Sequence, residues 1–161
     1  MGRDPDRAID ALLGRDDACR YADRPFAFIF RYVRLRTLSH AVIAAAVLAA
    51  GGFVALLDAI AELGRVAGLD EAGALAIYGP LIEQTLGNAR ALGIRAALTG
   101  PMTRGDRGTL DAHLAALRRH APDVVPLYAA AAEREIALAE ARGTLTPEAA
   151  ESLRSSLASA V

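Results

Sequence analysis

Lysine and tryptophan are absent from this chain of 161 residues, and Cys19 is its single cysteine. A lone cysteine has no intrachain partner, which excludes a disulfide-stapled scaffold and is typical of the reducing cytoplasm. Aromatic residues make up only 5% of the chain. Because strands favour aromatic and β-branched side chains, this composition argues against a β-sandwich or β-barrel.

An excess of charge of either sign is also missing. The 18 basic residues, all of them arginine, nearly balance the 19 acidic residues and leave a formal net charge of −1. We therefore expect no nucleic-acid partner and no strong attraction to an acidic membrane surface. Hydrophobic residues make up 53% of the chain, which excludes a disordered protein.

Alanine, in contrast, is abundant, with 37 residues in the chain. Because alanine has the highest helix propensity, the composition predicts an all-α fold, a multi-helix domain around a long Ala-rich central helix. The length permits one domain, which we place at residues 37–161 after an irregular N-terminal segment, residues 1–36. Within that segment Pro5 and Gly14 bracket a short predicted helix, and residues 26–33 fit an extended piece.

The longest uncharged run covers residues 41–57. Seventeen residues is close to the lower limit for a bilayer-spanning helix, and Arg31, Arg34 and Arg36 precede it as they would on a cytoplasmic flank. Nine of the seventeen residues are Ala or Gly, however, and the helical pattern continues through Asp58. The pattern favours a buried central helix over a membrane anchor, which stays the alternative.

Capping and stop signals divide the rest of the chain into further helices. Asp70 is placed to cap a helix after Gly68, and Pro80 marks a helix start or a kink. Thr146 and Pro147 form a strong start signal for the last helix. Apolar residues at helical spacing are expected inside these helices. They are Leu81, Ile82, Leu86, Leu92, Leu110, Leu114, Leu117, Val124, Leu127, Ala131, Ile136, Leu138, Leu153 and Leu157.

The densest cluster of special residues is a loop that begins at Thr99 and ends on a helix N-terminus. Free amide groups, the helix dipole and an arginine can bind an anion at such a place. The candidate substrate-binding residues in this loop are Thr99, Gly100, Pro101, Arg104, Gly105 and Asp106. The alternative, which the pattern slightly favours, is a Gly-Pro turn with Asp106 as a helix cap and with arginines that are solvated or paired with Asp106 and Asp111.

Other polar residues give weaker signals. Asn88, within an apolar helix, is a seventh candidate binding residue, although a solvent-facing amide is the commoner role. The histidines, His40, His113 and His120, have no second ligand at zinc spacing, so no metal site is predicted. His113 follows Leu110 and precedes Leu114 and Leu117, which favours a packed or half-exposed histidine over a catalytic one. The chain has no P-loop, GxGxxG, GxSxG, HExxH or CxxC pattern.

The sequence from Ala44 to about Leu117 resembles a known family. Its most specific part is TGPMTRGD, residues 99–106, followed by HLAAL, residues 113–117. It resembles the C-terminal domain of bacterial proteins that join a Rossmann-like domain to the domain of unknown function 2520. The resemblance implies a fold like the C-terminal domain of 6-phosphogluconate dehydrogenase, an all-helical half that forms a dimer and closes over NAD(P) held by a separate Rossmann domain.

The chain departs from this family pattern in two respects. Residues 1–30 are too short for a Rossmann unit and hold no glycine-rich turn, so we expect no cofactor bound by this chain alone and no autonomous activity. The Tyr-His and Ser-Asn pairs that face the cleft in the family are replaced by Val42-Ile43 and Ala50-Gly51, and His40 is out of register.

Three functions stay open at this point. The first is a helical dimerisation or substrate-side domain of an NAD(P)-dependent oxidoreductase-like protein, which lacks its own dinucleotide-binding domain and can pair with a Rossmann-domain chain. The others are a fragment of a complete NAD(P)-dependent oxidoreductase, with Thr99, Arg104 and Asp106 in its cleft, and a small membrane-associated protein anchored by residues 41–57. We expect a cytoplasmic homodimer, because a small domain cannot easily cover a helix that is apolar nearly all round.

Overall fold

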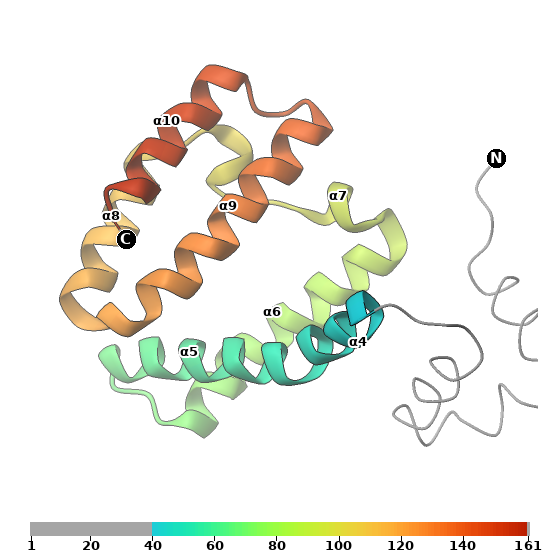
Figure 1. The fold of residues 1–161 in the computed structure, drawn as a ribbon. Helices are drawn as coiled ribbons and strands as arrows, with labels where there is room; N and C mark the ends of the chain where they lie inside the picture. The colour runs from blue at the N-terminus through green and yellow to red at the C-terminus, as the bar shows by residue number, and fades with distance from the viewer. Residues whose placement is uncertain (1–39, 161) are drawn as a thin grey trace, which may run out of the picture. The chain divides into compact units, whose positions relative to one another are not determined.

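A computed structural model describes residues 40–160, which are mainly helical and contain no β-strand in that range (Figure 1). This confirms the predicted all-α, multi-helix fold. The described elements are α4 (His40–Val47), the π-helical turn η1 (Leu48–Gly52), α5 (Phe53–Val66), α6 (Glu71–Leu92), α7 (Ile94–Ala97), the 3₁₀ turn η2 (Met102–Arg104), α8 (Arg107–His120), the 3₁₀ turn η3 (Pro122–Val124), α9 (Val125–Arg142) and α10 (Pro147–Ala158). The predicted boundary at residue 36, the N-terminal helix, the extended piece and Cys19 lie outside the described residues.

The chain divides into two compact units, residues 1–55 and 56–161. The first is described from His40 onward and consists of α4, η1 and the beginning of α5. It has no charged residue after His40, and α4 has no buried residue. The unit therefore presents an apolar helix without a core of its own among its described residues.

The helix that begins at His40 continues without interruption to Val66 and is 27 residues long. Its length and composition are sufficient for a membrane span. No residue of its most apolar window is buried, and buried positions appear only from Ala59 onward. The expectation of a buried central helix is therefore wrong for the described residues, because the buried positions of this helix are confined to its C-terminal turns.

In the second unit, a tight turn joins α5 to α6. Gly68 adopts a φ of +80°, and the Leu69 amide donates to the Gly64 carbonyl at 3.1 Å. A β-carbon placed on Gly64 would lie 3.1 Å from the β-carbon of Ala74, so the glycine allows the two helices to approach closely. Asp70 caps α6 as predicted, since its carboxylate accepts a hydrogen bond of 2.7 Å from the Gly73 amide.

Helix α6 runs through Pro80 instead of beginning there. It is 22 residues long, yet Ala74 is its only buried residue. The apolar stripe predicted after Pro80 is therefore present but uncovered: Leu81 is 62% exposed and Leu86 is 52% exposed.

Helices α8, α9 and α10 pack together with η2 and form a well-defined core (Figure 1). Leucines from α8 and α10 meet a row of small residues on α9. The members of this cluster are Met102, Leu110, Leu114, Ala129, Ala132, Ile136, Ala139, Leu145, Ala150, Leu153 and Leu157. A second cluster joins α5 to the α8–α9 corner through Ala59, Leu117, Ala121, Val124 and Val125. The burial predicted for the leucines of α8 and α10 is confirmed.

The buried face of α9 differs in part from the predicted one. It is formed by Val125, Ala129, Ala132, Ile136 and Ala139, which recur every three or four residues. Two of the apolar residues predicted within this helix are exposed, and a third, Leu138, is only half-buried. The exposed pair is Leu127 and Ala131. Alanines occupy all sides of this helix, so the sequence pattern alone does not fix which side faces the core.

Candidate functional site

The predicted loop from Thr99 to Asp106 is a compact turn held by its own hydrogen bonds. The Thr103 hydroxyl donates to the Gly100 carbonyl at 2.8 Å, and the Asp106 amide donates to the Pro101 carbonyl at 3.0 Å. Gly105 adopts the left-handed conformation, with φ +66°. A β-carbon there would lie 3.1 Å from that of Ala149, so both backbone shape and space call for glycine.

Asp106 is engaged as the N-cap of α8. Its carboxylate accepts a hydrogen bond of 3.0 Å from the Thr109 amide and one of 2.7 Å from the Thr109 hydroxyl. These two bonds, with the Thr109 side chain contributing most, lower the pKa of Asp106. The next residue, Arg107, pairs on the surface with Asp111, which lies one turn further along α8, at 3.3 Å. This geometry matches the turn-and-cap interpretation of the loop.

Anion binding at the same loop stays a prediction. Thr99 and Arg104 are exposed, whereas Gly100, Pro101 and Asp106 are half-buried in the turn. Six of the seven predicted binding residues lie in this one turn, residues 99–106. The seventh, Asn88, is exposed on α6, and its side-chain amide forms no hydrogen bond with another described residue.

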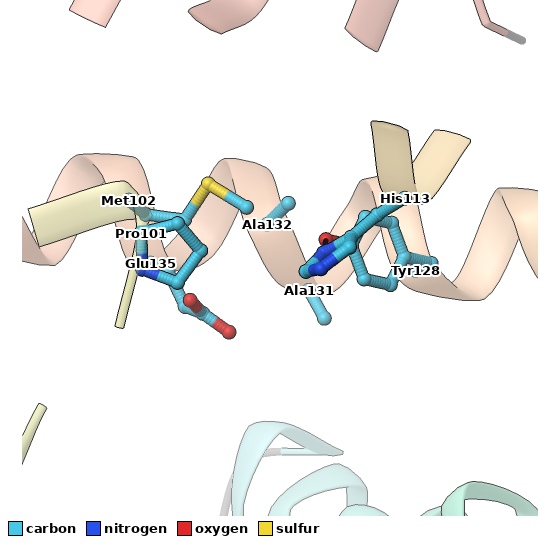
Figure 2. Close-up of a pocket in the computed structure, with 7 residues that line it drawn as sticks. All are labelled: Pro101, Met102, His113, Tyr128, Ala131, Ala132 and Glu135. Carbon is cyan, nitrogen blue, oxygen red and sulfur yellow. Dashed lines mark hydrogen bonds between the residues drawn. The ribbon is translucent and has the colours of Figure 1, made fainter. Parts of the chain in front are cut away.

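A cavity of about 220 Å³ adjoins this loop within the second unit. It is lined by Pro101, Met102, His113, Tyr128, Ala131, Ala132 and Glu135. In Figure 2, Pro101, Met102 and Glu135 gather at one end, and His113 and Tyr128 lie at the other, with the two alanines of α9 between them. The cavity is thus a short apolar trough with polar groups at both ends.

His113 and Tyr128 form a side-chain pair across α8 and α9. The Nδ1 atom of His113 lies 2.9 Å from the Tyr128 hydroxyl, and the two rings meet edge to face with centroids 6.1 Å apart. Burial raises the pKa of Tyr128, and the nearby charge of Glu135 adds to that shift. The phenol therefore stays protonated well above neutral pH and can donate or accept a hydrogen bond.

Glu135 supplies the opposite end of the cavity. Burial raises its pKa, and no hydrogen bond or ion pair to it is found among residues 40–160. Two other glutamates of α9 contrast with it, because Glu133 and Glu140 both pair with Arg154 of α10. A partly buried carboxylate without a partner loses hydration that nothing in the described chain replaces.

The family of the chain follows from a comparison with family models. The model described as Domain of unknown function (DUF2520) matches residues 33–135, which is more than half of the chain. The chain belongs to the DUF2520 family. The matched DUF2520 segment includes α4 to α8, the Thr99–Asp106 loop and α9 as far as Glu135. Searches of curated proteins and of solved structures found no match.

Within this DUF2520 segment, sequence reasoning identified the loop but missed most of the cavity. The sequence predicts a packed or half-exposed His113, whereas this residue is exposed and its ring is hydrogen-bonded to Tyr128. Tyr128 and Glu135 were not singled out. The sequence does contain a usable signal for this pair. Tyr128 and Glu135 are seven residues apart, which places them on the same side of a helix, and the small residues Ala131 and Ala132 lie between them.

Residues 40–160 contain no group of three or more side chains suited to a metal ion.

Proposed function

We propose that this chain is the helical dimerisation and substrate-side domain of an NAD(P)-dependent oxidoreductase-like protein. Two copies associate in the cytoplasm through the apolar side chains that α4, α5 and α6 each leave exposed. NAD(P) is then held by a Rossmann-type domain other than the described helices. The observation that carries the dimer is the amount of large apolar surface that these helices leave uncovered.

This surface is concentrated in one part of the sequence. Of fifteen exposed large hydrophobic residues among those described, fourteen lie between Ile43 and Ile94, and the other is Leu127. Those on α4, η1 and α5 are Ile43, Val47, Leu48, Phe53, Val54, Leu56 and Val66. Those on α6 and α7 are Leu75, Ile77, Tyr78, Leu81, Leu86, Leu92 and Ile94. Exposed apolar surface of this extent marks an interaction site.

The composition of α6 points the same way. Three glycines, Gly73, Gly79 and Gly87, and Pro80 lie inside the helix, and each costs helical stability compared with alanine. Such a helix is not maintained in water by its own propensity and needs packing partners. Gly79 and Gly87 face open space in the single chain, so another helix has room to approach the backbone closely there.

A second copy of the chain fits this surface better than a charged partner does. Residues 41–57 carry no charge, and the net charge of −1 gives two copies little reason to repel one another. A self-complementary contact also explains why both long helices are apolar and exposed, since a two-fold interface presents the same surface from each subunit.

Membrane anchoring is a second candidate because the 27-residue helix from His40 to Val66 is long and apolar enough to cross a bilayer. An anchor of this kind leaves the leucines of α6 uncovered, however. Helix α6 also contains Glu71, Glu83 and Arg90, which do not belong in a hydrocarbon core. A dimer accounts for both helices, and for that reason we prefer it.

Substitution of Leu81 by Glu tests the proposed surface. Leu81→Glu places a charge on the exposed stripe of α6, and burial of that charge in an interface without a partner is strongly unfavourable. We expect sedimentation equilibrium to show a dimer for the unmodified chain and a dissociation constant at least about 100-fold higher for Leu81→Glu.

The matched control is Leu127→Glu, which adds the same charge at the exposed leucine outside this surface. It should leave the dissociation constant unchanged. Equal weakening by both substitutions would contradict the proposed interface, and a chain that stays in solution only with detergent would favour the membrane anchor.

Calorimetry with NADPH should give no binding heat for this chain alone.

A further inference from the structure

The cavity between the Pro101 loop and α9 has the features of a small-molecule site. Its volume of about 220 Å³ lies below the range of about 300–1,000 Å³ that is usual for drug-sized ligands, so its occupant is small. Its sides are formed by Pro101, Met102 and two alanines, which favour an apolar stem. Its ends are polar, which sets the orientation of that stem.

The charge of the site is decided by Glu135. This is the one carboxylate among the lining residues, and it is half-buried without a hydrogen-bond partner among the described residues. A cationic group that enters the cavity restores the interactions that the carboxylate lost on leaving water. An anionic group is repelled. The cavity therefore selects for a cation at this end.

The other end is formed by the pair His113 and Tyr128. Because Nδ1 of His113 engages the Tyr128 hydroxyl, its Nε2 atom is left to donate or accept a further hydrogen bond. Tyr128 and Glu135 are seven residues apart on α9, which corresponds to about 10 Å along the helix axis. A short chain with a polar group at each end spans such a distance.

We propose that this cavity binds a small aliphatic amine, with the ammonium group on Glu135, the carbon stem over Ala131 and Ala132, and a hydroxyl or similar neutral polar group at the His113–Tyr128 pair. The inference goes beyond the proposed dimerisation function and is independent of it, because every residue involved belongs to one chain.

Calorimetry with three five-carbon probes tests this assignment on the full chain. The probes are pentylamine, 5-amino-1-pentanol and 1-pentanol. We expect the two amines to bind and the alcohol without an amine not to bind, with 5-amino-1-pentanol the tighter of the two because it also reaches His113. Absence of amine binding at millimolar concentration, or equal binding of all three probes, would overturn the proposal.

Substitution of Glu135 by Gln keeps the shape of the side chain and removes its charge. Loss of a charge-assisted hydrogen bond should weaken amine binding at least about tenfold. Glu151→Gln, at an exposed carboxylate of α10 outside the cavity, should leave binding unchanged. Equal affinity of the unmodified chain and Glu135→Gln would refute the role of Glu135.

A second variant keeps the test decisive should Glu135→Gln fold poorly. Ala131 is exposed and lines the cavity, so Ala131→Leu fills the space without disturbing the core. We expect this variant to melt as the unmodified chain does and to lose amine binding. Retained binding in Ala131→Leu would show that amines bind elsewhere on the chain.

Discussion

At the residue scale, Arg154 is the most heavily engaged charged side chain in the described part of the protein. It donates to Glu133 at 2.9 Å and to both carboxylate oxygens of Glu140, at 3.3 and 2.6 Å, and so ties α10 to α9. Two parallel bonds between a guanidinium and a carboxylate are the most favourable form of ion pair. The hydrogen bonds from Arg154 are the main reason why the pKa of Glu140 is lowered.

Replacement of Glu140 by Gln is expected to lower the melting temperature at pH 7. Because the folded-state pKa of Glu140 is below its unfolded value, the carboxylate stabilises the fold above the usual glutamate pKa of about 4.3. That stabilisation disappears as the pH falls through the lowered folded-state pKa. Thermal melts from pH 7 down to pH 2 should therefore show the unmodified chain and Glu140→Gln converging at the acid end.

Glu151→Gln provides the control for this experiment, since Glu151 is an exposed carboxylate of the same helix as Arg154. It should change the melting temperature little at any pH. A difference between the unmodified chain and Glu140→Gln that persists undiminished at pH 2 would mean that the carboxylate charge is not its source.

At the scale of single elements, α8 depends on the residue immediately before it, the N-cap Asp106. Asp106 supplies the side-chain cap of this helix, and helix caps of this type contribute about 1 kcal/mol. We expect Asp106→Ala to lower the free energy of unfolding in urea by about that amount.

Arg104 lies two residues earlier on the same turn and is exposed without a side-chain partner among the described residues. Arg104→Ala should change the free energy of unfolding by less than about 0.5 kcal/mol. The reverse order of the two variants would contradict the capping role. If inorganic phosphate raised the melting temperature of the unmodified chain but not that of Arg104→Ala, the anion-site interpretation of this loop would be supported.

The elements that the sequence predicts well are those with local signals. Asp70, Asp106 and Thr146 each cap the helix they were expected to begin, because a cap is decided by residues three positions apart. The leucines of α8 and α10 are also buried as predicted. They recur every three or four residues and so share one side of each helix, while polar residues occupy the other side.

Features that depend on distant contacts were predicted less well. In α9, Ala129 to Ala132 are four consecutive alanines, and only packing against α8 and α10 decides which of them are buried. The cavity was missed for a related reason, because it combines a turn, one residue of α8 and two turns of α9. Burial of the α4–α5 helix was predicted from its apolar sequence, yet the sequence does not say whether the covering surface belongs to the same chain.

At the scale of the whole molecule, two kinds of surface are present in the described residues. The part from Leu98 onward contains the larger hydrophobic cluster and only one large exposed hydrophobic side chain, Leu127. The part from His40 to Ala97 has few buried residues and nearly all of the large apolar exposure. This division is the physical basis for the proposed dimer of this DUF2520 chain.

The most direct test of this account is the mass of the full chain in detergent-free buffer, measured by light scattering coupled to size-exclusion chromatography at micromolar concentration. The proposed dimer should give a single species with twice the chain mass of 16.8 kDa. A monodisperse species at 16.8 kDa would contradict it, because the apolar surface of α4, α5 and α6 would then face water in a stable monomer.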